Sequence, residues 1–257
     1  MPTPSTRTGA PNWVDLLTTD AAGAERFYGD LFGWVAEHGD QEKYGGYLTF
    51  FKDGKAVAGA MQKDDTMPMP DLWNVYLSST DAAGTLKSAE EHGGTVFMGP
   101  MEVPDVGVMG MVGDAGGVGV GVYQGGQFPG LGVIAEPGAP GWFELHSKNF
   151  AAATEFYRDV FGWELVAVSD TDEFRYSTLG PADSAAAGVM DASQFPDDWA
   201  QGWFVYFAVE GTDASVARAL ELGGSVLHPA EDTPYGRLAT LRDPFGAIFK
   251  LIGPNNG

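Results

Sequence analysis

Apolar and polar residues alternate with a period of two over residues 13–18, and this pattern predicts a β-strand. Val14 and Leu16 would point to one face of a sheet, whereas Trp13 and Asp15 would point to the other. Residues 142–146 show the same alternation in the second half of the chain. We therefore expect two strands in which the side chains of one face pack under a helix and those of the other face are free to line a binding site.

Helical spacing follows the first of these strands. Asp20 is a good N-cap for a helix that carries Ala24, Phe27 and Leu31 on one side, and Gly33 is a natural stop. Three further strands are expected after this helix, over residues 34–37, 46–51 and 56–61. The first half of the chain then repeats the order of one strand, one helix and three strands.

The second half repeats the first half at a nearly constant offset. Phe27 and Phe156 are 129 residues apart, and Trp73 and Trp203 are 130 residues apart. A repeat this regular indicates duplicated architecture. The prediction is an α+β chain of two tandem modules, each built from two βαβββ units. The expected boundaries are a flexible leader over 1–10, a first module over 11–124, a Gly- and Pro-rich linker over 125–140 and a second module over 141–257.

The charge of the chain narrows the classes of partner. Its 14 Lys and Arg against 35 Asp and Glu give a net charge of −21, which argues against nucleic acid because phosphates need basic contacts. The acidity fits either solubility or attraction of a cationic ligand.

No apolar run approaches the ~18–20 residues of a membrane span, and no signal-peptide pattern is present, so we expect a cytoplasmic location. The absence of cysteine excludes thiolate metal sites and cysteine nucleophiles.

Two motifs carry a resemblance to a known family. Phe-Tyr-x-x-x-Phe-Gly-Trp occurs at residues 27–34 and 156–163, and Asp-Pro-Phe-Gly occurs at 243–246, before the last expected strand. With the repeated units, these motifs resemble a two-module, actinobacterial-type member of the vicinal oxygen chelate superfamily, also called the glyoxalase/bleomycin-resistance/dioxygenase superfamily. The resemblance implies that paired units curl around a cleft. It also implies that enzymes of the superfamily hold a divalent metal there through His, Gln or Glu, whereas drug-binding members lack the metal.

The resemblance places the metal-ligand positions on residues that are not usual ligands. These positions fall on Trp13 and Trp142 in the first strands, Asn74 and Phe204 in the second units, and Gly121 and Lys250 in the late strands. A protonated Lys250 would repel a cation. The prediction is therefore no cofactor, with a divalent metal as the alternative, and the two tryptophans offer flat surfaces for stacking.

Glu144 and His146 lie on the same expected strand face as Trp142. They could form a general acid/base pair in which Glu144 fixes the tautomer of the imidazole, or they could supply two ligands of an atypical metal site. They could also be a structural hydrogen-bonded pair. The first module carries Asp15 and Leu17 at the equivalent positions, so the acid is present in both copies and the histidine in one.

Aromatic residues at equivalent places in the two modules complete the candidate site. The predicted ligand-binding set is Trp13, Asp15, Tyr47, Trp73, Asn74, Trp142, Tyr176, Trp203, Phe204 and Lys250. This set favours metal-independent binding of a small aromatic or polycyclic molecule in an apolar cleft, in drug sequestration and resistance or in natural-product biosynthesis. The alternative is an enzyme of the same fold, with a hydroxylase-like, isomerase or lyase activity that uses Glu144 and His146. Either function suits a monomer or a homodimer.

Overall fold

A computed structural model describes residues 4–5, 7–64, 66–181, 184–196, 199 and 201–256. The first module consists of β1 (Pro11–Thr18), α1 (Ala21–Phe32), β2 (Val35–His38), α2 (Gln41–Tyr44), β3 (Leu48–Lys52), β4 (Lys55–Gln62), β5 (Leu72–Ser78), α3 (Ala82–Glu91), β6 (Thr95–Val103), β7 (Gly107–Gly113) and β8 (Gly119–Gly125). The second module consists of β9 (Pro140–Ser147), α4 (Phe150–Phe161), β10 (Leu165–Asp170), β11 (Arg175–Leu179), β12 (Gly188–Asp191), β13 (Gly202–Ala208), α5 (Thr212–Glu221), β14 (Ser225–Thr233), β15 (Gly236–Arg242) and β16 (Ile248–Gly253). Residues 1–3 and 6 of the predicted leader lie outside the described residues. None of the helices in the described residues could cross a membrane.

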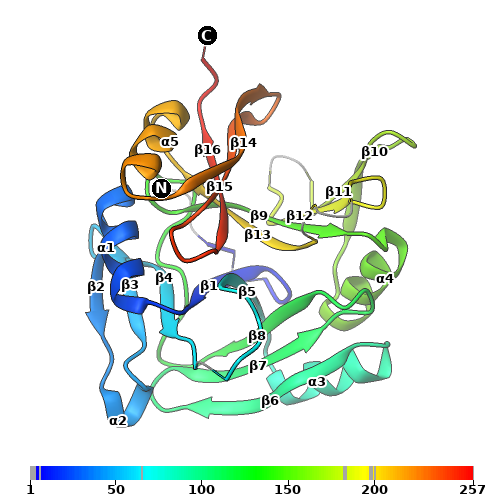
Figure 1. Cartoon of the computed structure of the whole chain (residues 1–257). Helices are drawn as coiled ribbons and strands as arrows, with labels where there is room; N and C mark the ends of the chain where they lie inside the picture. The colour runs from blue at the N-terminus through cyan, green and yellow to red at the C-terminus, as the bar shows by residue number, and fades with distance from the viewer. Residues whose placement is uncertain are drawn as a thin grey trace.

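Each module forms one mixed sheet of eight strands (Figure 1). The strand order is β2-β3-β4-β1-β5-β8-β7-β6 in the first sheet and β10-β11-β12-β9-β13-β16-β15-β14 in the second. The two βαβββ units of a module meet through one central antiparallel pair, β1 with β5 and β9 with β13. The identical order confirms the predicted α+β class and the prediction of two paired units in each of two modules.

Most helix ends follow from their capping residues. The side chain of Asp20 accepts a hydrogen bond from Gly23 N at the start of α1, and Gly33 ends that helix in the left-handed conformation with φ 71°. The short α2 was not predicted, because its four residues are too few to show a helical period. It begins where the Asp40 side chain accepts a hydrogen bond from Lys43 N.

The hydrophobic core lies between the two sheets. Helices α1 and α5 lie along one side of this core, and α3 and α4 lie along the other (Figure 1). The ring of Phe207 on β13 lies 5.2 Å from Trp73 on β5 and 5.3 Å from Trp34, so the modules share one aromatic cluster. We call the face of each sheet that is turned away from the other module its far side.

The period of two sorts the residues of the central strands between the core and the far side. Phe143 and Leu145 of β9 are buried in the core, whereas Glu144 and His146 alternate with them and point to the far side. The amphipathic alternation seen in the sequence therefore places the candidate chemistry on the side that faces away from the helices.

The predicted linker packs against the first module. Leu131 N donates to Asn12 O at 2.8 Å, and Gly132 N donates to Ala56 O at 2.7 Å, so the segment crosses the starts of β1 and β4. The ring of Phe128 meets Trp13 edge-on at 4.9 Å. This part of the chain consequently covers one of the predicted stacking residues.

Candidate ligand-binding site

Glu144 is the centre of a buried polar cluster on the far side of the second sheet. Its Oε1 accepts hydrogen bonds from His146 Nε2 at 2.6 Å and from the Tyr206 hydroxyl at 2.7 Å. Its Oε2 accepts one from the Tyr176 hydroxyl at 2.8 Å. Only 4% of Glu144 and 1% of His146 is exposed, so these bonds replace water as partners of the carboxylate.

The strand register brings these groups together. Phe204 lies opposite Glu144 in the antiparallel β9–β13 pair, and Gly188 lies beside Glu144 in the parallel β9–β12 pair. A Cβ atom at Gly188 would lie 1.9 Å from the Tyr176 hydroxyl oxygen, so a side chain at this position would displace the tyrosine. The glycine therefore allows Tyr176 to lie across β12 and reach Glu144.

The protonation states follow from burial and hydrogen bonding. Burial alone would raise the pKa of Glu144, but the hydrogen bond from His146, the nearby Lys250 and the hydrogen bond from Tyr206 together outweigh it and hold that pKa well below its usual range. Burial lowers the pKa of His146, so the imidazole is neutral at pH 7. The cluster thus pairs an ionised carboxylate with a neutral histidine.

The contacts of His146 select one tautomer. Its Nε2 faces Glu144, which only accepts, so this nitrogen carries the hydrogen. Its Nδ1 faces Trp199 Nε1 at 3.4 Å and is the acceptor of that pair. The ring of Trp199 stacks on His228 of β14 at 4.1 Å, which fixes the indole against the site. Trp199 was missed in the sequence because it lies in the connection after β12, where no periodic pattern places a side chain.

Lys250 joins the cluster from β16. Its Nζ lies 2.9 Å from the Tyr206 hydroxyl, 3.3 Å from His146 Nε2 and 3.7 Å from Glu144 Oε1. The same Nζ lies 4.8 Å from the ring centroid of Phe204 and 4.7 Å from that of Tyr206. Tyr206 was also missed in the sequence, although it follows Phe204 by two residues and so shares its strand face.

The first module has the same framework with different chemistry. Asp15 accepts hydrogen bonds from Asn74 Nδ2 at 2.9 Å and from the Tyr47 hydroxyl at 3.2 Å. Burial raises the pKa of Asp15. Gly121 stands where the second module has Lys250, and the ring of Tyr76 lies over this glycine. The basic residue of the second far side therefore has no counterpart in the first.

Methionines make the far side of the first sheet more apolar. Met98 pairs with Met111, and Met101 pairs with Met109, in the β6–β7 register. The equivalent pairs in the second module are His228 with Thr240 and Glu231 with Leu238. Long, pliable methionine side chains suit an apolar surface that adapts its shape. The prediction of an apolar surface thus describes the first module better than the second.

The structure gathers eight of the ten predicted ligand-binding residues into the two far-side clusters and separates two from them. Trp142 Nε1 donates to the Tyr176 hydroxyl at 3.1 Å, and Trp13 Nε1 donates to the Tyr47 hydroxyl at 2.8 Å. Trp73 and Trp203 were expected in the cleft but lie on the core side, which corrects that prediction. Successive residues of a strand point to opposite faces. Asn74 and Phe204 occupy the far side, so the preceding residues Trp73 and Trp203 must point to the core.

The two core tryptophans have structural partners instead. Trp73 Nε1 donates to the Tyr28 hydroxyl at 3.0 Å, and Trp203 Nε1 donates to the Tyr157 hydroxyl at 2.9 Å. Their rings meet the same tyrosines at 5.2 Å and 5.7 Å. Both indoles are therefore committed to packing between the sheets and the first helix of each module.

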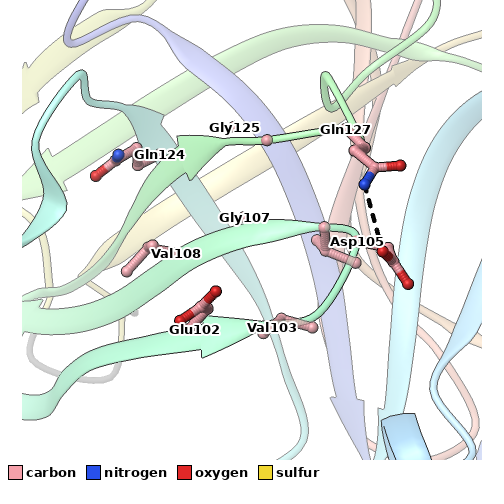
Figure 2. A pocket seen from close by; sticks show the side chains of 10 residues that line it. Glu102, Val103, Asp105, Gly107, Val108, Gln124, Gly125 and Gln127 are labelled. Carbon is pink, nitrogen blue, oxygen red and sulfur yellow. Dashed lines mark hydrogen bonds between the residues drawn. The ribbon is translucent and has the colours of Figure 1, made fainter.

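Two surface hollows lie away from these clusters. One, of about 230 Å³, is bordered by β6, β7 and the residues after β8, and Figure 2 shows Gln127 donating to Asp105 at its rim, at 3.3 Å. The other, of about 680 Å³, lies between α1, the linker and α5. Neither contains a predicted site residue. The Glu144 cluster is the candidate site, because convergent polar groups with shifted pKa values are typical of functional sites.

Comparison with known proteins decides the family. The model of the family described as "Glyoxalase/Bleomycin resistance protein/Dioxygenase superfamily" matches residues 10–122 and again residues 139–251. The chain belongs to this superfamily. The two matched stretches agree with the two sheets, and the superfamily named from the sequence motifs is thereby confirmed.

Relatives from actinobacteria match nearly the whole chain. The anthracycline biosynthesis protein DnrV of Streptomyces peucetius is 36% identical, over 97% of this chain and 94% of that protein. The putative glyoxylase CFP32 of Mycobacterium bovis is 34% identical, over 96% of each chain. The chain is thus similar both to a protein named for anthracycline biosynthesis and to one named as a glyoxylase.

Solved structures share the fold at low sequence identity. The Mn(II)-bound glyoxalase from Novosphingobium aromaticivorans matches with a TM-score of 0.66 and 15% identity, over 97% of this chain and 83% of that one. The 2,3-dioxygenase LapB from Pseudomonas sp. KL28 matches with a TM-score of 0.63 and 16% identity, over 98% and 94%. These likenesses establish the fold of this superfamily member.

The prediction that no cofactor is involved is contradicted by these neighbours, since one of them is a Mn(II)-bound enzyme and others are dioxygenases. Such an ion needs at least three protein ligands. Glu144 and His146 are two potential ligands, and the described residues contain no group of three or more His, Cys, Asp or Glu that could hold a metal. Lys250 Nζ lies 3.7 Å from Glu144 Oε1. This donor set does not fit the metal of the family.

Proposed function

We propose that the chain binds a small aromatic or polycyclic organic molecule on the far side of its second sheet and serves natural-product biosynthesis. The observation that carries this proposal is the Glu144 cluster, in which Tyr206, His146 and Lys250 present polar groups beside the ring of Phe204. Aromatic side chains with a few convergent polar groups are a usual lining of a small-molecule site.

The aromatic lining supports a flat ligand. The ring of Phe204 lies 4.7 Å from the imidazole of His146, and Phe195 lies 4.9 Å from Trp199. Aromatic rings favour offset or edge-on contact with another π-system. The biosynthetic role is supported by the anthracycline biosynthesis proteins DnrV and DauV, which are 36% and 35% identical to this chain.

Titration with 1,4-dihydroxyanthraquinone, a planar tricyclic quinone, tests the proposal. Binding should quench tryptophan fluorescence with a saturable curve. Phe204→Ala should weaken the affinity about tenfold, since a well-placed ring contact is worth about 0.5–1.5 kcal/mol. The matched control is Asn74→Ala, the equivalent position of the first module, which should leave the affinity unchanged. Equal affinity of wild-type and Phe204→Ala proteins would contradict the proposal.

Acid/base catalysis at the same site is the second candidate. It is favoured by one observation, the neutral His146 whose Nε2–H is held by Glu144 and whose Nδ1 is the accepting nitrogen. A neutral imidazole in a fixed tautomer can take a proton from a bound hydroxyl or an acidic C–H. His146→Ala should then abolish turnover of a substrate while leaving quenching by the quinone largely intact. Turnover that survives His146→Ala would exclude this role.

A further inference from the structure

Lys250 is a buried basic residue whose first-module equivalent is a glycine. Its side chain is 9% exposed, and it reaches the far side of the second sheet beside Tyr206 and Glu144. Gly121 and Lys250 occupy the same register position, each beside a tyrosine of the parallel neighbouring strand. The first module forms the same strand arrangement without an amine at this position, so the fold does not require Lys250.

The Lys250 amine has few hydrogen-bond acceptors within range. His146 Nε2 uses its hydrogen on Glu144 at 2.6 Å and cannot accept from Lys250. Glu144 Oε1 is 3.7 Å from Nζ, beyond hydrogen-bond range. Among the described residues, an ammonium with three N–H groups would find one acceptor in range, the Tyr206 oxygen at 2.9 Å. Burial lowers the pKa of Lys250 and outweighs the nearby Glu144 carboxylate, which raises it. Desolvation and the shortage of acceptors therefore both favour the neutral amine.

Lys63 shows how the same protein holds a buried ammonium. Its side chain is 8% exposed, and its Nζ lies 2.9 Å from Asp71 Oδ1 and 2.7 Å from the Met69 carbonyl oxygen. Two close acceptors, one of them a carboxylate, satisfy the charge. Lys250 lacks this arrangement, because Glu144 Oε1 lies 3.7 Å from its Nζ, within ion-pair distance but outside hydrogen-bond range.

We propose that the Lys250 amine forms a reversible imine with an aldehyde or ketone group of a molecule bound on the far side of the second sheet. This proposal rests on the proposed function for the site and adds the chemical class of the ligand, a carbonyl compound carrying an aromatic ring. A desolvated lysine with a free electron pair is the nucleophile that such chemistry requires.

The covalent step balances without a further reactant. The Nζ electron pair attacks the carbonyl carbon, the C=O π bond opens, and one N–H proton passes to the oxygen to give a carbinolamine. The second N–H proton and the hydroxyl then leave as water, and the C=N bond forms. Tyr206, whose hydroxyl lies 2.9 Å from Nζ and 2.7 Å from Glu144 Oε1, is placed to pass protons between the nitrogen and the carbonyl oxygen. No oxidant or reductant is consumed.

The surroundings of Nζ suit the protonated imine. Glu144 is ionised and lies 3.7 Å away, so it can act as the counter-ion of an iminium. The rings of Phe204 and Tyr206 have their centroids 4.8 Å and 4.7 Å from Nζ, a distance at which aromatic faces stabilise a cation. The same groups also attract an ammonium at Nζ, so the free amine before the reaction depends on desolvation of the lysine, whereas the iminium has one N–H in place of three to satisfy.

Reductive trapping with benzaldehyde and sodium cyanoborohydride at pH 7.4 tests the proposal on the full chain. Reduction converts the imine to a stable benzylamine that mass spectrometry of a digest locates. At this pH about 0.1% of an exposed lysine is neutral. Lys250 should therefore be labelled at least about tenfold faster than Lys87, whose side chain is 77% exposed, while Lys63 stays unlabelled. Labelling of Lys250 no faster than that of Lys87 would overturn the proposal.

Two variants separate this chemistry from a folding defect. Lys250→Met and Lys250→Arg should both lose the fast adduct, and Lys250→Arg keeps a long basic side chain if the methionine variant misfolds. Fast single labelling that persists in Lys250→Arg would also overturn the proposal. A chain that binds 1,4-dihydroxyanthraquinone but shows no fast label at Lys250 would contradict the imine alone. A chain that labels Lys250 but does not bind the quinone would contradict the proposed function and support the imine.

Discussion

The Tyr28 hydroxyl of α1 donates a hydrogen bond of 2.9 Å to Asp243 Oδ2, and these two residues belong to different modules. Asp243 Oδ1 at the same time accepts from the backbone N–H groups of residues 245, 246 and 247, in the turn that leads into β16. A helix of the first module therefore holds the turn that positions Lys250. The family motif that contains Asp243 thus has a physical role at the junction of the two modules.

Tyr28→Phe should destabilise the protein by about 1–3 kcal/mol, because it leaves a buried carboxylate oxygen and the Trp73 indole N–H without their partner. Urea unfolding at pH 7.5 measures this loss. Tyr157→Phe is the matched variant, and it should cost less, since Asp114 is close enough to raise the pKa of Tyr157 but its Oδ2 has no hydrogen-bond partner within range among the described residues. An equal cost for both variants would show that the Tyr28–Asp243 hydrogen bond adds nothing to the free energy of unfolding.

Lys250→Met should cost about 1 kcal/mol or less, since a neutral amine loses one hydrogen bond to Tyr206. Lys63→Met should cost about 3–5 kcal/mol, because it strands the buried Asp71 carboxylate. The two lysines are almost equally exposed, so the comparison isolates the charge state. Equal losses in urea unfolding would indicate that Lys250 is an ammonium and would count against the imine.

Much of this arrangement could be predicted from residue patterns. The period of two placed Trp142, Glu144 and His146 on one strand face, and the capping residues placed the helix ends. The same period, applied to β5 and β13, would have moved Trp73 and Trp203 into the core, since Asn74 and Phe204 alternate with them. Tyr206 could have been found in the same way.

Other parts of the site depend on tertiary packing that a local pattern does not encode. Trp199 lies in an irregular connection and reaches His146 because His228 of a distant strand supports its ring. The number of acceptors within reach of Lys250 depends on where the Nε2 hydrogen of His146 points. The prediction of no cofactor was also wrong. It was inferred by counting residues to the expected ligand positions, and such a count does not determine what proteins of this fold bind.

His146 should make stability fall as the solution becomes acidic. Its folded pKa is lowered, so below the unfolded value of about 6.5 the unfolded chain takes up a proton that the folded chain does not. The free energy of unfolding then falls by up to about 1.4 kcal/mol per pH unit, until the pH reaches the folded pKa. His146→Leu, which copies Leu17 of the first module, should remove this component.

The measurement is the difference in unfolding free energy between wild type and His146→Leu from pH 7.5 to pH 5. The groups that face the imidazole are Glu144, Lys250, Trp199 and Phe204. The folded pKa of Glu144 lies well below this window, and its unfolded value of about 4.3 lies below pH 5. His38→Gln, at a side chain that is 63% exposed, is the control and should show a flat difference. A flat difference for His146→Leu as well would show that the buried imidazole titrates normally.

Gly188→Ala should both destabilise the second module and weaken ligand binding. The added Cβ would lie 1.9 Å from the Tyr176 hydroxyl oxygen, so the tyrosine must move and release Glu144. The expected cost is about 1–3 kcal/mol, as for other overpacked sites. Gly59→Ala is the matched control, because its Cβ would meet the Tyr47 hydroxyl at the same 1.9 Å in the first module. Both variants should lose stability, but only Gly188→Ala should lose affinity for 1,4-dihydroxyanthraquinone. The reverse result would place the binding site on the methionine-rich far side of the first sheet.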